Sequence, residues 1–112
     1  MRRGTTPDYQ LSIYGHDLTQ QSVYVTIKQG CGRNENILTL TGDRLTMIYD
    51  KETMTSTITF SLTQQETLNF KDGAGEIQVR FINAEGDAKA TNKKSIPFLP
   101  ILNEAVIEYV GD

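Results

Sequence analysis

The chain has 112 residues, a length that favours one domain, and its formal net charge of −3 argues against nucleic-acid binding. No apolar run approaches the roughly 20 residues of a membrane-spanning helix, and the opening Met-Arg-Arg-Gly leads into no hydrophobic segment. We therefore expect no membrane contact and no signal peptide. The single cysteine, Cys31, rules out an intrachain disulfide and fits synthesis in a reducing cytoplasm.

The first half of the chain predicts short β-strands. Apolar residues alternate with polar ones around Leu11 and again around Val25, which is the period of a half-buried strand. A polar, glycine-rich loop follows at residues 29–36. Alternation then resumes on both sides of the turn sequence at residues 41–44, so we predict a hairpin over residues 37–50.

The next strand runs into a segment near residues 63–70 where the pattern becomes helical. Thr63 and Glu66 have the spacing of a capping box, in which each residue's side chain satisfies a backbone N–H of the other. A helix this short is unstable alone and must be held by packing. We predict one helical turn, with Leu68 plugging the open end of the fold and Phe70 supporting it.

The last third of the chain continues the β pattern. Strands are predicted around Val79 and, more weakly, over residues 88–98, with Gly86 in the turn between them. Pro97 lacks a backbone N–H, which places it at a sheet edge or a bulge. Residues 105–110 are apolar and β-branched, so we expect a final strand rather than a helical arm.

These elements predict a single all-β domain over residues 1–112. Seven to nine short strands at even spacing are typical of a β-sandwich or barrel. The N-terminal arm (residues 1–8) has no apolar anchor before Tyr9, so we expect it to be flexible until a partner orders it. Residues 100–112 form a C-terminal extension.

Residues with catalytic or metal-binding chemistry are sparse. His16 is the only histidine and Cys31 the only cysteine, so the chain cannot build the usual His/Cys zinc site. Asp17 is adjacent to His16 and not free to orient it across a site, so we predict no Ser-His-Asp triad. The acidic residues that could pair in a hydrolase are instead dispersed over turns: Asp43, Asp50, Glu52, Asp72, Glu85 and Asp87. We therefore predict no enzyme activity, no cofactor and no metal.

The tyrosines divide by strand phase. Tyr9 and Tyr49 share the apolar phase of their strands and are expected in the core. Tyr14 and Tyr24 fall on the opposite phase, where they can line a surface patch for a ligand or for a subunit contact.

Several motifs together resemble a known group of proteins. They are RRGTTP at residues 2–7, VYVTIKQG at 23–30, ITFSLTQQETL at 58–68, IQVRFI at 77–82 and VIE at 106–108. In this order they resemble small proteins encoded among the tail genes of Firmicutes phages and prophages. More loosely, they are similar to the immunoglobulin-like N-terminal domain of phage baseplate upper proteins.

This resemblance implies an immunoglobulin-like antiparallel β-sandwich in a non-enzymatic structural protein of a phage or prophage tail or baseplate. It implies synthesis in the host cytoplasm, later association with the virion, and contacts with copies of itself or with neighbouring tail proteins. It carries no catalytic residues. The candidate interaction surface consists of Arg2, Arg3, Tyr14, Tyr24, Ile107 and Tyr109.

Two alternatives stay open from the sequence. One is a carbohydrate-binding or adhesion module that uses Tyr14, Tyr24 and nearby loops to bind a glycan. The other is a housekeeping domain of undefined role.

Overall fold

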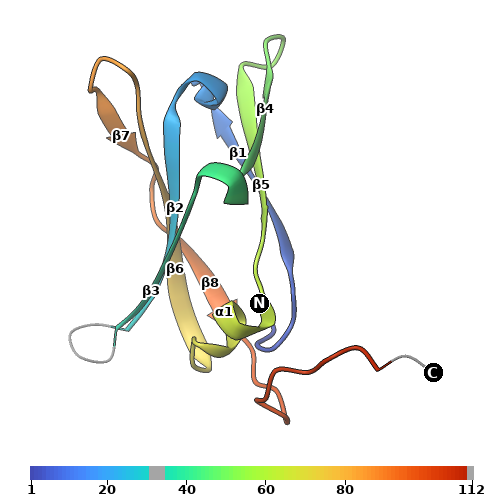
Figure 1. Ribbon diagram of the computed structural model, residues 1–112. Coiled ribbons are helices and arrows are strands. Elements are labelled where there is room, and N and C mark those ends of the chain that lie inside the picture. The colour runs from blue at the N-terminus through green and yellow to red at the C-terminus, as the bar shows by residue number, and fades with distance from the viewer. Residues whose placement is uncertain (31–34, 111–112) are drawn as a thin grey trace.

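The computed structural model describes residues 1–30 and 35–110, and in it two antiparallel β-sheets pack face to face (Figure 1). One sheet has three strands in the order β1-β5-β4; the other has five, in the order β3-β2-β6-β7, with β8 pairing to another part of β6. This confirms the predicted all-β sandwich. The strands are β1 (Asp8–Tyr14), β2 (Ser22–Gln29), β3 (Asn36–Thr41), β4 (Thr46–Asp50), β5 (Thr55–Ser61), β6 (Gly73–Ile82), β7 (Ala88–Ala90) and β8 (Lys94–Phe98).

The core lies between the sheets and is built by the predicted alternation. In β2, for example, Val23, Val25 and Ile27 are buried while the residues between them face outward. Tyr9 lies on the core side, half-buried, and stacks on Phe60 with ring centroids 5.6 Å apart. Tyr49 is likewise half-buried, so neither tyrosine is enclosed in the core, and only Tyr9 packs against it.

The predicted hairpin over residues 37–50 is wrong. β3 pairs with β2 in the five-stranded sheet, whereas β4 pairs with β5 in the three-stranded sheet. The short 3₁₀ helix η3 (Gly42–Arg44) joins them, and Gly42 has a φ of +60°, which suits glycine. Leu40 and Leu45 on its two sides are both buried. Alternation alone could not distinguish this crossing from a turn, because both connections leave the strand patterns unchanged.

The predicted helical turn is confirmed as α1 (Gln64–Leu68), and its capping box is complete. The Glu66 backbone N–H donates to Thr63 Oγ1 at 3.1 Å, and the Thr63 backbone N–H donates to Glu66 Oε1 at 2.8 Å. These two bonds satisfy backbone donors that the first helical turn leaves without partners.

Replacing Thr63 with alanine is expected to lower the free energy of unfolding by about 1 kcal/mol, because the cap is lost. Urea titration of the two proteins measures the difference. Gln65→Ala is a suitable control, since Gln65 is exposed on the same helix and takes no part in the cap. Equal midpoints for Thr63→Ala and the wild type would contradict this role of the capping box.

The predicted roles of Leu68 and Phe70 are reversed in the structure. Phe70 is buried, with 2% of its surface exposed, and stacks on Phe98 at a centroid distance of 4.4 Å. Leu68 is only half-buried. Leu68 is the last residue of α1, whereas Phe70 lies beyond the C-cap Asn69, so the helix does not fix the two side chains in one direction. The inward position on α1 itself belongs to Thr67, which is fully buried.

The C-terminal third also departs from expectation. The strand predicted over residues 88–98 is two strands, β7 and β8, and Pro97 lies in β8 at the sheet edge, as predicted. Residues 101–110 form neither strand nor helix, so the predicted final strand is wrong. A strand needs a free neighbour, and the outer side of β8 is already occupied: Arg2 and Leu99 form a parallel bridge just beyond it.

Candidate interaction surface

The N-terminal arm crosses from one sheet to the other. Arg2 bridges Leu99 beside β8, the chain turns at Gly4 with a φ of +75°, and β1 then begins at Asp8 in the opposite sheet. The Gly4 backbone N–H donates to Thr67 Oγ1 at 2.9 Å, which ties the turn to α1. The arm therefore has anchors within the chain, contrary to the expectation of a flexible segment.

Arg3 is the main anchor of this arm, and it is polar. Its guanidinium donates to the backbone oxygens of Phe70, at 2.5 Å, and Leu68, at 3.2 Å. It also pairs with Asp72 at 3.0 Å and with Glu104 at 2.7 Å. Only 6% of the Arg3 surface is exposed, so this residue does not belong to an exposed surface as predicted. It instead connects the N-terminal arm, the end of α1 and the C-terminal extension.

A second set of polar contacts holds the C-terminal extension beside α1. The Gln64 side-chain amide donates to the Ile107 carbonyl oxygen at 2.9 Å and accepts from the Ile107 N–H at 2.8 Å. Arg2 donates to the Pro100 carbonyl oxygen at 2.8 Å. With Glu104 on Arg3, these contacts hold the extension by its backbone and one carboxylate. Ile101 packs near Gly4 and Leu68, but most apolar side chains after it are exposed.

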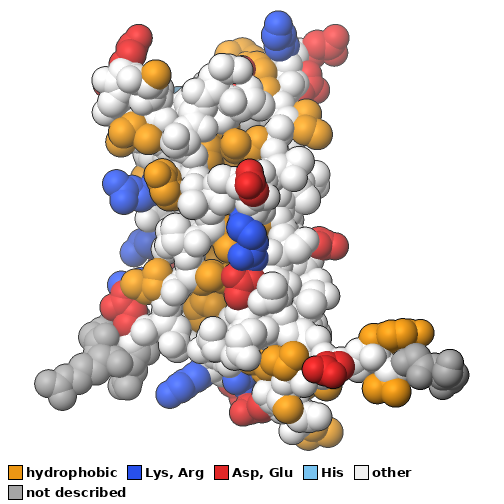
Figure 2. Space-filling view, in the orientation of Figure 1, with side chains coloured by type: hydrophobic (Ala, Val, Ile, Leu, Met, Phe, Trp, Pro, Cys, Tyr) orange, Lys and Arg blue, Asp and Glu red, His pale blue; other side chains and the backbone are white. Residues whose placement is uncertain are grey.

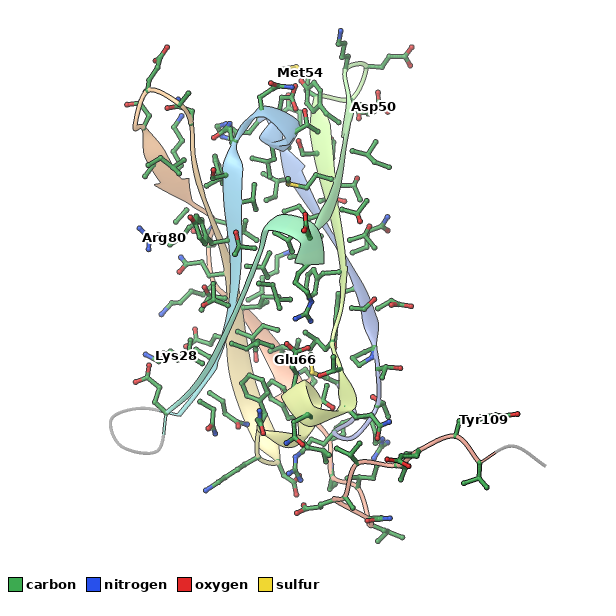
Figure 3. The ribbon with its side chains drawn as sticks, viewed as in Figure 1. Lys28, Asp50, Met54, Glu66, Arg80 and Tyr109 are labelled. Atoms are coloured by element: carbon green, nitrogen blue, oxygen red, sulfur yellow. The ribbon has the colours of Figure 1, made fainter. Side chains whose placement is uncertain are left out.

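Those side chains form what we term the C-terminal apolar surface. Figure 1 shows the extension leaving the end of the sandwich near α1, and Figure 2 shows hydrophobic side chains along it. Figure 3 shows Tyr109 well away from the sheets. Tyr109 is 96% exposed and Ile107 60% exposed. The surface comprises Leu102, Val106, Ile107, Tyr109 and Val110, all exposed.

A recess of about 510 Å³ lies beside this surface. Its wall is the start of α1 with the end of β5, and Val106 and Arg44 border it. Arg44 makes a forked ion pair with Glu66, whose two carboxylate oxygens lie 2.7 and 3.0 Å from its guanidinium nitrogens. This bonding with Arg44, aided by the backbone of Thr63, lowers the pKa of the Glu66 carboxyl below its ordinary value.

Replacing Glu66 with glutamine is expected to destabilise the protein at neutral pH but not in acid. Glutamine also completes a capping box, so the change removes the charge and keeps the cap. Because the folded pKa of Glu66 is lowered, its stabilisation is complete above the unfolded value of about 4.3 and is lost as the pH falls through the folded value. Urea titrations of both proteins from neutral pH down to about pH 3 measure the difference. A difference that stays constant with pH would contradict the ion pair's contribution.

The structure does not unite the predicted surface residues in one patch. Arg2 contacts the extension at the Pro100 carbonyl oxygen, and Ile107 and Tyr109 lie further along the same extension. Tyr14, 73% exposed, lies on the outer face of the three-stranded sheet. Tyr24, 42% exposed, lies on the outer face of the five-stranded sheet, so these two tyrosines form no joint patch.

Sequence reasoning missed the polar residues that bind backbone groups. Gln64 and Arg3 hold the terminal segments, and Gln29 uses the same device on Lys71: its amide donates to the Lys71 oxygen at 2.6 Å and accepts from the Lys71 N–H at 2.7 Å. Gln29 is also buried, with 8% exposed. Hydrophobic alternation carries no signal for such contacts, because their partners are main-chain atoms distant in sequence.

The described residues offer little chemistry. Within them, no three His, Cys, Asp or Glu side chains come together as metal ligands would. The His16 ring packs on Phe81, with centroids 5.0 Å apart, and Cys31 lies outside the described residues. Among the described residues there is also no helix with the length and apolar character needed to cross a membrane.

Comparisons with known proteins give no further assignment: no protein-family model matches the sequence, and no curated protein matches it either.

Proposed function

We propose that this chain is a non-enzymatic structural component of a phage or prophage tail or baseplate, with an immunoglobulin-like sandwich, that acts by binding copies of itself or neighbouring tail proteins. After synthesis in the host cytoplasm it becomes part of the virion. The sequence motifs at residues 2–7, 23–30, 58–68, 77–82 and 106–108 support this family assignment by resemblance.

The structural observation that carries the proposal is the C-terminal apolar surface. Five large apolar side chains stand exposed on an extension that polar contacts hold in place. Burying one such side chain at a contact contributes about 1.5–3 kcal/mol of favourable free energy from the hydrophobic effect. Exposed apolar patches of this kind mark protein–protein contact sites, and a segment held by its backbone presents them in a defined position.

The carbohydrate-binding alternative gains no support from the described part of the chain. Its two aromatic candidates, Tyr14 and Tyr24, lie on the outer faces of different sheets and cannot stack on one sugar. The assembly proposal therefore accounts for more of the surface.

Mass spectrometry of purified phage or induced prophage particles tests the proposal. We expect the chain to be present in the tails, and the double variant Ile107→Ser with Tyr109→Ser to be depleted from them about tenfold or more, because the apolar contact is lost. Ile48→Ser is the matched control, since Ile48 is 68% exposed on β4, away from the extension, and this variant should be incorporated normally. Absence of the wild-type chain from the particles would overturn the proposal.

A further inference from the structure

The free edge of β1 is a second surface with the properties of a contact site. β1 pairs with β5 along its whole length, from Asp8 opposite Ser61 to Tyr14 opposite Thr55. In the described part of the chain no strand pairs with its other side. Alternate N–H and C=O groups on that side are therefore available to another strand.

This edge lacks the features by which proteins usually prevent edge pairing. β1 contains no lysine, arginine, proline or glycine, and its only charged residue is Asp8 at the start. The edge strand β8, by contrast, carries Pro97, which has no N–H to donate to a further strand. Pro97 protects the β8 edge in this way, and no residue of β1 does the same for the β1 edge.

The inward side of β1 is also incompletely covered. Leu11 and Ile13 are half-buried and border a groove of about 210 Å³ between the two sheets. Its other wall combines the apolar Ile77 and Val79 of β6 with polar side chains that include Lys94. A strand added beside β1 would cover Leu11 and Ile13 and place its own inward side chains at the mouth of this groove.

The sequence of β1 is complementary to itself in antiparallel pairing centred on Leu11. In that register Leu11 meets Leu11 of the second copy, and Tyr9 meets Ile13, an aromatic–aliphatic pair favoured across strands. On the outer face Gln10 meets Ser12, and the Asp8 carboxylate meets the hydroxyl of Tyr14. No like charges are opposed, and each of these unlike pairs occurs twice about the two-fold axis.

We propose that two copies of this chain pair through their β1 edges, antiparallel about Leu11, to form a continuous six-stranded sheet. The occupant of the edge is a second copy, because the register that aligns β1 with itself matches apolar with apolar and donor with acceptor at every position. This contact between copies does not rest on the phage assignment: it concerns the purified chain and holds whatever the C-terminal apolar surface binds.

Charge variants on the exposed face of β1 test the pairing. Gln10→Lys with Ser12→Lys places lysine opposite lysine twice in the dimer, whereas Gln10→Lys with Ser12→Glu places lysine opposite glutamate twice. Within one copy both positions face threonines of β5, Thr59 and Thr57, so neither variant opposes charges across β5. Like charges directly opposite are destabilising and opposite charges stabilising.

Sedimentation velocity over about 10 µM to 1 mM is the measurement. We expect the wild type to dimerise, the lysine–lysine variant to dissociate about tenfold more readily, and the lysine–glutamate variant to dimerise at least as well as the wild type. A wild type that stays monomeric throughout would overturn the proposal. So would a dimer that both variants leave unchanged, since the contact would then lie elsewhere.

Cysteine cross-linking tests the register. In a Cys31→Ser background, Gln10→Cys and Ser12→Cys chains should form a disulfide on oxidation when mixed, because directly opposed residues bring their Cβ atoms within reach. Either variant alone should cross-link several-fold less. In a dimer of one variant the two cysteines are not directly opposite each other, because residue 10 of one copy faces residue 12 of the other. Equal cross-linking of the mixture and the single variants would overturn the register about Leu11. Cross-linking is measured on the purified chains, whereas the proposed function is tested by incorporation into particles. A failure of β1 pairing can therefore be told apart from a failure of the proposed function.

Discussion

Phe70→Ala is expected to lower the free energy of unfolding by about 3–5 kcal/mol, the largest effect among the single substitutions considered for this chain. Phe70 is 2% exposed and stacks on Phe98 at 4.4 Å with an angle of 15° between the rings. The Phe98 ring in turn lies over Gly75, where an added Cβ would come within 2.6 Å of it. Neighbours held this closely cannot collapse into the space left by the lost ring, so a cavity persists.

Leu68→Ala is the matched control for Phe70→Ala. Leu68 is only half-buried, near Gly4 and Ile101, so we expect a loss of about 1–2 kcal/mol. Urea titration of the wild type and both variants gives the two differences. A larger loss for Leu68→Ala than for Phe70→Ala would restore the sequence-based assignment of Leu68 as the plug and contradict the structure.

Arg3→Met is expected to lower the free energy of unfolding by about 2–4 kcal/mol. Methionine keeps much of the volume but leaves the carbonyl oxygens of Leu68 and Phe70 without the donor they have in the native protein. Hydrogen bonds to a charged group contribute about 1.5–3 kcal/mol. The Asp72 and Glu104 side chains are 55% and 62% exposed, so water can replace the arginine there at little cost.

Two controls separate these contributions to the effect of Arg3. Glu104→Gln removes one ion pair and is expected to change stability by less than about 1 kcal/mol. Arg2→Met changes the exposed residue next to Arg3 and should alter the free energy of unfolding by less than about 0.5 kcal/mol. All are measured by urea titration. If Glu104→Gln proved as destabilising as Arg3→Met, the stabilisation by Arg3 would come from the ion pair with Glu104 and not from its contacts with backbone oxygens.

The sequence alone predicts the strands well because their pattern is local. Alternation around Leu11, Val25 and Val79 requires only that one face of each strand meets the core, and the structure places all three in strands. The capping box of α1 is equally local, since Thr63 and Glu66 are three residues apart. These features need no knowledge of which strand lies beside which.

What could not be predicted depends on contacts between distant segments. The connection from β3 to β4 crosses between sheets because of how each strand is paired, which alternation does not encode. Residues 105–110 have strand-forming side chains, yet the chain beside the end of β8 is already occupied by Arg2, which bridges Leu99. Arg3 is buried and donates to backbone oxygens 65 and 67 residues away in the sequence. Its charge alone favoured an exposed position, so the sequence-based prediction was wrong.

We propose that the C-terminal apolar surface mediates assembly, and hydroxyl-radical footprinting of purified tail particles and of the free protein is the test. Tyr109 is 96% exposed in the free chain, and labelling there is expected to fall several-fold in particles. Met54, 47% exposed in the turn after β4 at the other end of the sandwich, is the internal reference, and its labelling should change little (Figure 3). If Tyr109 is labelled as strongly in particles as in the free protein, the extension is not buried there and the claim is wrong.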